Sequence, residues 1–146
     1  MSSLLNETQA YPRAEQHLHD AADALGVDVR LVPGVRNAVE ILAEIDDEPA
    51  LVNVEVSYSC ELPKPEGDVF DRNRRLFERL GDWWRTQGYR IVTEEMSEPF
   101  TVLRVADPDD GFVIALRQGK IGNLWFTVNS PPVTATGAEA PPPGLA

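Results

Sequence analysis

The sequence predicts a single two-layer α+β domain, in which two or three helices pack on one face of a mostly antiparallel sheet of about five strands. Two observations predict it. Most segments with apolar residues at helical spacing precede residue 88, and most segments with alternating apolar residues follow it. Helices and strands that are grouped along a chain in this way are typical of α+β domains. A chain of 146 residues can bury one hydrophobic core without metals or disulfides.

The domain is expected to span residues 11–130. Residues 1–10 are expected to be flexible, and residues 131–146 are expected to form a disordered tail. The stretch after Val133 is rich in proline and alanine, and Leu145 is its one large apolar residue.

A first helix is predicted in residues 11–25, and Gly26 follows it as a stop signal. Its apolar residues recur on one helical face, at Ala14, Leu18, Ala21, Ala22 and Leu25.

A second helix is predicted in residues 33–49, where Pro49 closes the segment. The preceding residues 27–32, Val-Asp-Val-Arg-Leu-Val, favour a strand instead. A helix, a strand or both therefore remain open for residues 27–48. The helical prediction rests on the spacing of Val35, Ala38, Val39, Leu42 and Ile45.

Residues 51–60 are predicted to form an antiparallel strand that is buried on one side and wet on the other. Polar residues alternate there with an apolar set formed by Val52, Val54, Val56, Tyr58 and Cys60. The proline-rich residues 61–68 are too irregular to continue the strand.

A helix in residues 69–87 places the pair Trp83 and Trp84 on its apolar stripe, which favours a core position over an exposed binding site. Gly88 can adopt the left-handed conformation that ends a helix, so Tyr89 is expected to pack back against the last turn. Trp83, Trp84 and Tyr89 are therefore predicted to be core aromatics. The other members of the stripe are Val69, Leu76, Phe77 and Leu80.

Four strands are predicted in the last part of the domain, in residues 89–95, 100–106, 112–118 and 124–129. The Asp-Pro-Asp-Asp-Gly sequence of residues 107–111 predicts a tight turn, because Pro108 presets the turn and Gly111 can take a positive φ.

The charge of the chain limits its partners. Twenty-four acidic and thirteen basic residues give a net charge of −11, which argues against nucleic acid and anionic membranes as partners. It permits a basic protein partner, and it promotes solubility without one. The sequence does not determine the oligomeric state, and a dimer remains one of the alternatives. One cysteine, no signal-like N-terminus and no long apolar run predict a cytoplasmic protein.

Neither histidine has the spacing of a zinc pair, because His17 and His19 point in different directions on a helix. Glu15, His19 and Asp23 share a face and suit a weak metal site, but an exposed polar face is favoured. No metal and no cofactor are expected.

Other chemical candidates are also interpreted as structural. Asp107 begins a sequence similar to a calcium loop, but its second position is Pro108 and its twelfth, where a glutamate is needed, is Gln118, so a turn is favoured. Cys60 on an apolar strand face favours a small buried hydrophobe over a nucleophile. The acidic runs in residues 44–49 and 93–99 are interpreted as solvated loops rather than as paired catalytic carboxylates.

Trp125 is the leading candidate for a binding residue. It alternates with Leu124 and Phe126, which places it on the opposite face of the sheet. If that face is open, Trp125 together with Asn123 and Thr127 forms a tentative interaction site.

Three segments resemble motifs of a group of small actinobacterial α+β proteins that have no assigned activity: WWRTQGYRIV from Trp83, DDGFVIAL from Asp109, and SPPV from Ser130. In that group a helix ending in Trp-x-x-x-Gly-Tyr precedes a strand, and an Asp-Gly-Phe hairpin leads to a terminal Ser-Pro-Cys. Many members are lipoproteins. The resemblance covers about half of the chain and implies the α+β fold but no catalytic residue.

The sequence also departs from that group. It has no lipobox, and Pro132 stands where such proteins often carry a cysteine. Cys60 is then left without a partner, as suits a reduced cytoplasm.

No catalytic constellation is visible, so the protein is not expected to be an enzyme. The preferred hypothesis is an acidic protein-interaction domain, of the kind used by immunity proteins or secretion chaperones. The alternative is a small-ligand-binding module with a pocket between the helix of residues 69–88 and the sheet.

Overall fold

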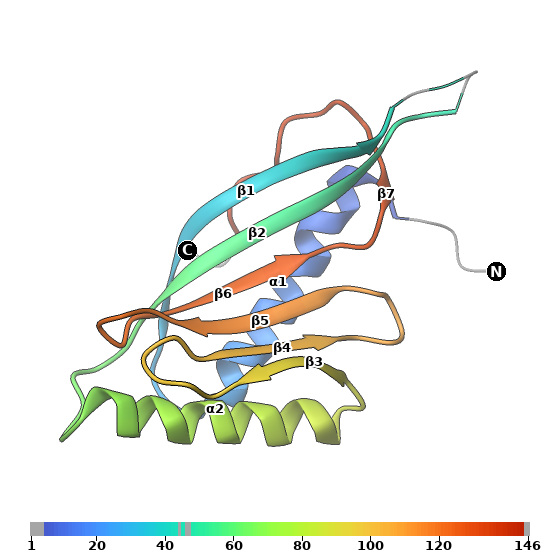
Figure 1. Cartoon of the computed structure of the whole chain (residues 1–146). Coiled ribbons are helices and arrows are strands. Elements are labelled where there is room, and N and C mark those ends of the chain that lie inside the picture. The colour runs from blue at the N-terminus through green and yellow to red at the C-terminus, as the bar shows by residue number, and fades with distance from the viewer. Residues whose placement is uncertain (1–4, 44, 46–47, 145–146) are drawn as a thin grey trace.

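The computed structural model describes residues 5–43, 45 and 48–144, and this part of the chain forms two helices and seven strands (Figure 1). The helices are α1 (Glu7–Ala24) and α2 (Val69–Thr86). The strands are β1 (Arg30–Leu42), β2 (Leu51–Glu61), β3 (Arg90–Glu95), β4 (Val102–Ala106), β5 (Val113–Gln118), β6 (Leu124–Asn129) and β7 (Val133–Thr134). The predicted α+β class is confirmed, and the sheet has more strands than the expected five.

The strands form one antiparallel sheet in the order β1-β2-β6-β5-β4-β3, with β7 paired to the start of β2. β3 to β6 are neighbours both along the chain and in space. α2 connects β2 to β3 at the far side of the sheet, and β6 returns to pair with β2. β1 and β3 are therefore the two edge strands.

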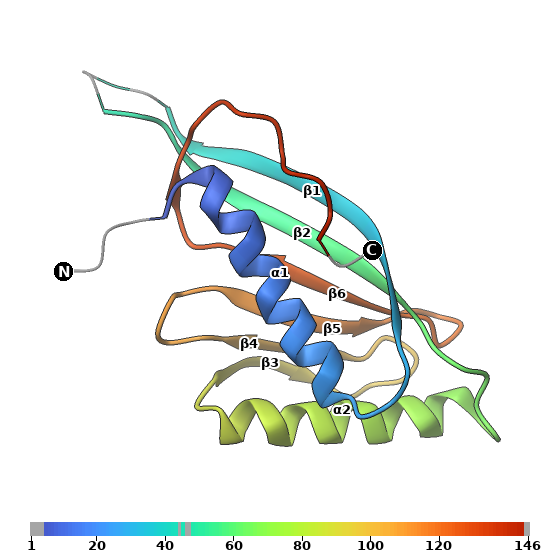
Figure 2. The ribbon, with the colours of Figure 1, turned by 180° about the vertical axis from the view of Figure 1, so that it is seen from behind.

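Both helices contribute to one hydrophobic core. α1 crosses one face of the sheet over β2 and β6, as Figure 2 shows, and α2 runs beside β3 and β4. No described helix covers the opposite face, which is turned toward the viewer in Figure 1. Neither helix combines the length and the apolar character that crossing a bilayer requires. The strand residues of the core include Val54, Val56, Tyr58, Val105, Ile114, Leu116, Phe126 and Val128.

α1 begins earlier than the sequence analysis expects. Asn6 caps it by accepting a hydrogen bond from the Gln9 backbone N–H, and the Gln9 side chain accepts one from the Asn6 N–H in return. Such a capping box satisfies two donors at the helix start. The helix therefore includes residues 7–10 of the segment expected to be flexible, whereas residues 1–4 of that segment lie outside the described residues.

The second predicted helix is wrong, because residues 30–42 form β1. β1 pairs with β2 over most of its length, with register shifts near Gly34 and Ile41. The helical spacing of Val35, Val39 and Leu42 misleads here. β-branched residues fit a pleated strand well, and pairing with β2 gives their backbone its partners.

The C-terminal part of α2 has the expected arrangement. Trp84 is buried, and Trp83 and Tyr89 are partly buried against the core. Gly88 has a φ of 87°, and the Tyr89 ring stacks on Trp84 with 6.4 Å between centroids. These residues join the helix to β3.

The segment after residue 130, expected to be disordered, makes defined contacts up to Gly144. β7 pairs with β2, and the Ala135 N–H donates to the Ala50 carbonyl at 2.8 Å. The chain then crosses the helix-covered face beside α1 (Figure 2). Residues 145–146 lie outside the described residues.

Candidate functional site

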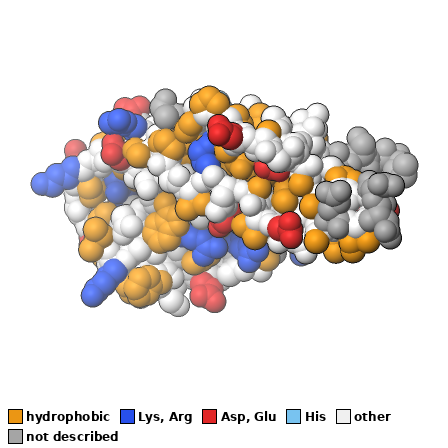
Figure 3. All heavy atoms as spheres, turned by 90° about the horizontal axis from the view of Figure 1, so that it is seen from above, with side chains coloured by type: hydrophobic (Ala, Val, Ile, Leu, Met, Phe, Trp, Pro, Cys, Tyr) orange, Lys and Arg blue, Asp and Glu red, His pale blue; other side chains and the backbone are white. Residues whose placement is uncertain are grey.

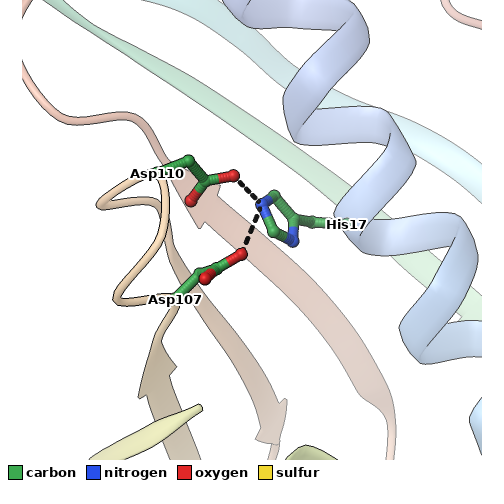
Figure 4. Close-up of side chains that lie close together, drawn as sticks. All are labelled: His17, Asp107 and Asp110. Carbon is green, nitrogen blue, oxygen red and sulfur yellow. Dashed lines mark hydrogen bonds and ion pairs between the residues drawn. The ribbon is translucent and has the colours of Figure 1, made fainter. Parts of the chain in front are cut away.

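Side chains that are far apart in the sequence meet between α1 and the β4–β5 turn (Figure 4). His17 Nε2 lies 2.7 Å from Asp110 Oδ2 and 3.7 Å from Asp107 Oδ2. The other ring nitrogen, Nδ1, lies 3.0 Å from the Tyr89 hydroxyl. Arg13 Nε donates to the same Asp110 oxygen at 2.7 Å. The cluster joins α1, the exit of α2 and the β4–β5 turn.

The turn itself aims the two carboxylates. Asp107 Oδ1 accepts the Asp109 N–H at 2.9 Å, and Asp110 Oδ1 accepts the Phe112 N–H at 3.0 Å. Aspartate commonly stabilises turns by bonding the backbone two residues ahead. Each carboxylate thus uses one oxygen for the turn and presents the other to His17.

The protonation states follow from these contacts. Burial alone would raise the pKa of Asp110, but hydrogen bonds from the Phe112 N–H, His17 and Arg13 outweigh it and hold this pKa below its usual value. An ionised carboxylate only accepts, so His17 Nε2 carries a proton toward Asp110. Burial, aided by Asp107 and Asp110, raises the pKa of Tyr89 to about 12. The phenol is therefore protonated at neutral pH.

The chain Tyr89–His17–Asp110 has the order of a proton relay, in which Tyr89 itself is poorly suited to act as the acid or base. A catalytic acid or base works best with a pKa near the working pH, and the pKa of Tyr89 lies far above it.

Ligand atoms of His17, Asp107 and Asp110 lie within 4.8 Å of one another, a donor set that suits a divalent cation. Arg13 already supplies the positive charge that Asp110 needs.

Replacing Asp110 with asparagine should lower the free energy of unfolding by about 1.5–3 kcal/mol at neutral pH, because the hydrogen bonds to a charged acceptor are lost. The depressed pKa of Asp110 stabilises the fold above its unfolded value of about 4, and this contribution disappears as the pH falls through the folded value. The difference between the wild-type chain and the variant should therefore narrow below about pH 4. Urea unfolding of both chains at a series of pH values measures this difference in the free energy of unfolding.

Asp109→Asn is the matched control, since Asp109 lies exposed in the same turn. This variant should unfold like the wild-type chain at every pH. An Asp110→Asn deficit that stays constant down to the lowest pH would contradict the ionised state of Asp110.

A cavity of about 290 Å³ lies between α2 and residues 94–101, where the sequence analysis places its alternative pocket. This volume is at the small end for ligand sites. Two rim glutamates form ion pairs, Glu98 with Arg74 and Glu94 with Arg85. Glu78 has no ion-pair partner among the described residues. Phe70, Phe77 and Met96 form apolar parts of the lining.

A buried amide pair fixes one wall of this cavity. Asn73 Nδ2 donates to Gln118 Oε1 at 3.0 Å and to the Gly122 carbonyl at 2.7 Å. Gln118 Nε2 in turn donates to the Pro99 carbonyl at 2.6 Å. These bonds attach α2 to the end of β5 and to the β5–β6 turn, so they hold Gln118 in the wall of the cavity.

Trp125 and Thr127 lie together on the uncovered face of the sheet, half-buried on β6. Trp125 pairs with Ser59 of β2 and with Arg117 of β5, so its neighbours across the strands are a hydroxyl and a guanidinium. Asn123 lies in the turn before β6, where its carbonyl accepts the Gly119 N–H at 2.8 Å. The structure thus brings Trp125 and Thr127 together and leaves Asn123 at the end of the strand.

The other candidate residues occupy simpler positions. His19 is exposed, 3.6 Å from Asp20 and 3.8 Å from Asp23. Cys60 packs against the core, and burial raises the pKa of its thiol to about 12, which opposes thiolate chemistry. In the acidic run 44–49, residues 44, 46 and 47 lie outside the described residues.

The outer edge of β1 exposes an unusual amount of apolar surface. Val35, Val39, Ile41 and Leu42 expose 46%, 50%, 48% and 50% of their surface. Figure 3, which views the molecule from above Figure 1, shows hydrophobic side chains along this side. No described strand pairs with the outer side of β1. Three of these residues, Val35, Val39 and Leu42, belong to the predicted helical stripe of residues 33–49, and Ile41 does not.

Comparisons with known proteins found no matching family model, no matching curated protein and no matching solved structure.

Proposed function

We propose that the chain is a non-enzymatic protein-interaction domain, which binds an extended segment of a basic partner protein along the outer edge of β1. The apolar exposure of Val35, Val39, Ile41 and Leu42 on this edge carries the proposal. A long, unpaired, apolar edge strand is a template for pairing with another chain. Peptide binding by strand addition draws affinity from the backbone and specificity from alternate side chains.

The charges near β1 favour a basic partner segment. Arg30 pairs with Glu61 at 3.5 Å, and Arg36 pairs with Glu15. Glu40 and Glu55 have no ion-pair partner among the described residues, so the unpaired charges on β1 and β2 are negative. The net charge of −11 would steer such a partner toward the molecule.

Trp125 suits a second contact on the uncovered face. The sheet order places β6 next to β2, so Trp125 is separated from β1 by one strand. Arg117 and Arg104 lie further from β1, on β5 and β4. A basic partner would therefore cover β1 and β2 and end at Trp125, because Arg117 lies directly beside Trp125 on β5.

The test is capture of a partner from the native host by the wild-type chain and by a Val39→Lys/Ile41→Lys variant. The wild-type chain should retain a protein at low salt and release it at high salt, because exposed charges are screened. The variant should retain none, since two lysines oppose a basic segment and replace apolar contacts. Both positions are exposed, so its melting temperature should stay close to that of the wild-type chain.

Val92→Lys is the control, because Val92 is 41% exposed on β3, the other edge strand. It should bind like the wild-type chain. Equal retention of the same protein by all three chains would contradict an interface at β1.

The alternative is a small-ligand site in the cavity beside α2. Apolar Phe70 and Phe77 together with the unpaired Glu78 suit a small cation with an apolar body. A thermal-shift screen of amines tests it. Clear stabilisation by one compound, without any salt-sensitive protein partner, would favour this function over the first.

A further inference from the structure

The C-terminal segment lies along α1 and β1, where it contacts a buried ion pair, and its place on these two elements is called the groove. Arg36 of β1 pairs with Glu15 of α1, and their side chains are only 10% and 9% exposed. The Arg36 guanidinium lies 5.2 Å from the centre of the buried Tyr11 ring. Tyr58 also receives a hydrogen bond from Arg36 Nη1 at 3.4 Å. The groove therefore has a charged floor between two tyrosines.

The backbone of the C-terminal segment completes this ion pair. Arg36 Nη2 donates to the Pro141 carbonyl at 2.7 Å, and Glu15 Oε2 accepts the Gly144 N–H at 2.6 Å. The ion pair itself uses Arg36 Nη1 and Glu15 Oε1. A buried ion pair stabilises a fold only when its remaining donors and acceptors are also satisfied. The segment supplies a backbone partner to each member of the pair.

The proline sequence sets the register of these two contacts. Residues 141–143 are three prolines, which offer carbonyl acceptors and have no N–H. The first N–H after Pro141 therefore belongs to Gly144, and it donates to Glu15. Proline-rich segments also lose little conformational freedom on binding. The groove thus contacts the Pro141 carbonyl as an acceptor and the Gly144 N–H as a donor, with two prolines between them.

We propose that this groove is a binding site for a proline-rich segment of a partner protein, and that the chain's own C-terminus occupies it as a competing ligand. The site is separate from the outer edge of β1, because Arg36 faces the helices while Val39 faces the uncovered side. A tethered segment competes at an effective concentration on the order of millimolar. Release of the C-terminus is then the step that opens the groove.

The experiment uses a chain truncated after Thr134, which keeps β7, and a synthetic peptide with the sequence of residues 137–146. Calorimetry or NMR titration should show binding to the truncated chain, and at least tenfold weaker binding to the full-length chain. The Val39→Lys/Ile41→Lys change should leave peptide binding to the truncated chain intact, so the result is independent of the β1 edge. A cooperative unfolding transition of the truncated chain, at a lower temperature than that of the full-length chain because Arg36 and Glu15 lose backbone partners, shows that the truncated chain is folded.

A peptide with Gly144→Pro is the matched control, because it lacks the N–H that Glu15 accepts and leaves the protein unchanged. Its binding should be at least tenfold weaker. Equal binding of the two peptides, or no binding to the folded truncated chain at millimolar peptide, would overturn the proposal. A full-length chain that dimerises through exchange of its C-terminus would also overturn it, since the groove would then serve a second copy.

Discussion

Replacing Trp84 with alanine is expected to lower the free energy of unfolding by about 3–5 kcal/mol, because a large buried side chain is removed and its cavity collapses only in part. Trp84 is 1% exposed and supports the stacked ring of Tyr89. Small domains are typically stable by about 5–15 kcal/mol, so this loss is a large share of the free energy of unfolding. Urea unfolding followed by circular dichroism measures the loss.

Two other tryptophans are controls for this substitution. Trp83 is partly buried, and Trp125 lies half-buried on the uncovered face, so alanine at either position should cost clearly less. Equal losses at all three positions would show that tryptophan content, rather than the core position of Trp84, determines stability.

Replacing His17 with alanine is expected to cost about 1–3 kcal/mol, because the Asp110 carboxylate and the Tyr89 hydroxyl each lose a hydrogen-bond partner. Asp107 and Asp110 would face each other without the imidazole between them, and Arg13 would remain as the ion-pair partner of Asp110. The Tyr89 hydroxyl would lose its hydrogen bond as well. Chemical denaturation at neutral pH measures this loss.

His19→Ala is the matched control on the same helix. His19 is exposed, and its contacts with Asp20 and Asp23 are surface ion pairs of little value. Its replacement should change stability by less than about 0.5 kcal/mol. A His17→Ala chain as stable as His19→Ala would mean that the cluster contributes nothing to the fold.

The strands with one buried face were the most predictable part of the fold. Residues 51–60 and 124–129 alternate cleanly between apolar and polar residues, and they pair with each other as β2 and β6. The exit of α2 was equally clear, since Trp84, Gly88 and Tyr89 form a local pattern with one structural solution.

The helix predicted for residues 33–49 is wrong because the apolar residues of β1 fit the helical period better than the two-residue period of a strand. Val35, Val39 and Leu42 have helical spacing, and the residues between them do not alternate strictly. The pairing with β2 decides the structure, and this pairing is a tertiary interaction that the local sequence does not encode. The same residues end up on an exposed edge.

The histidine cluster could not be found from spacing. In the sequence, His17 belongs to a helical pattern and Asp107 to a turn pattern, and both of these local structures are confirmed. Their meeting depends on how α1 crosses the sheet, which brings residues 93 positions apart within hydrogen-bond distance. By contrast, the cap formed by Asn6 and Gln9 is a local signal that could have been read from the sequence.

The strand order also constrains how the chain is made. During synthesis from the N-terminus, β2 emerges well before β6, its neighbour in the finished sheet. Until residues 124–129 leave the ribosome, the β1–β2 hairpin therefore has an apolar face and two open edges. Exposed strand edges and exposed apolar faces promote aggregation. The β1–β2 hairpin thus stays open to aggregation from the time β2 emerges until β6 has emerged.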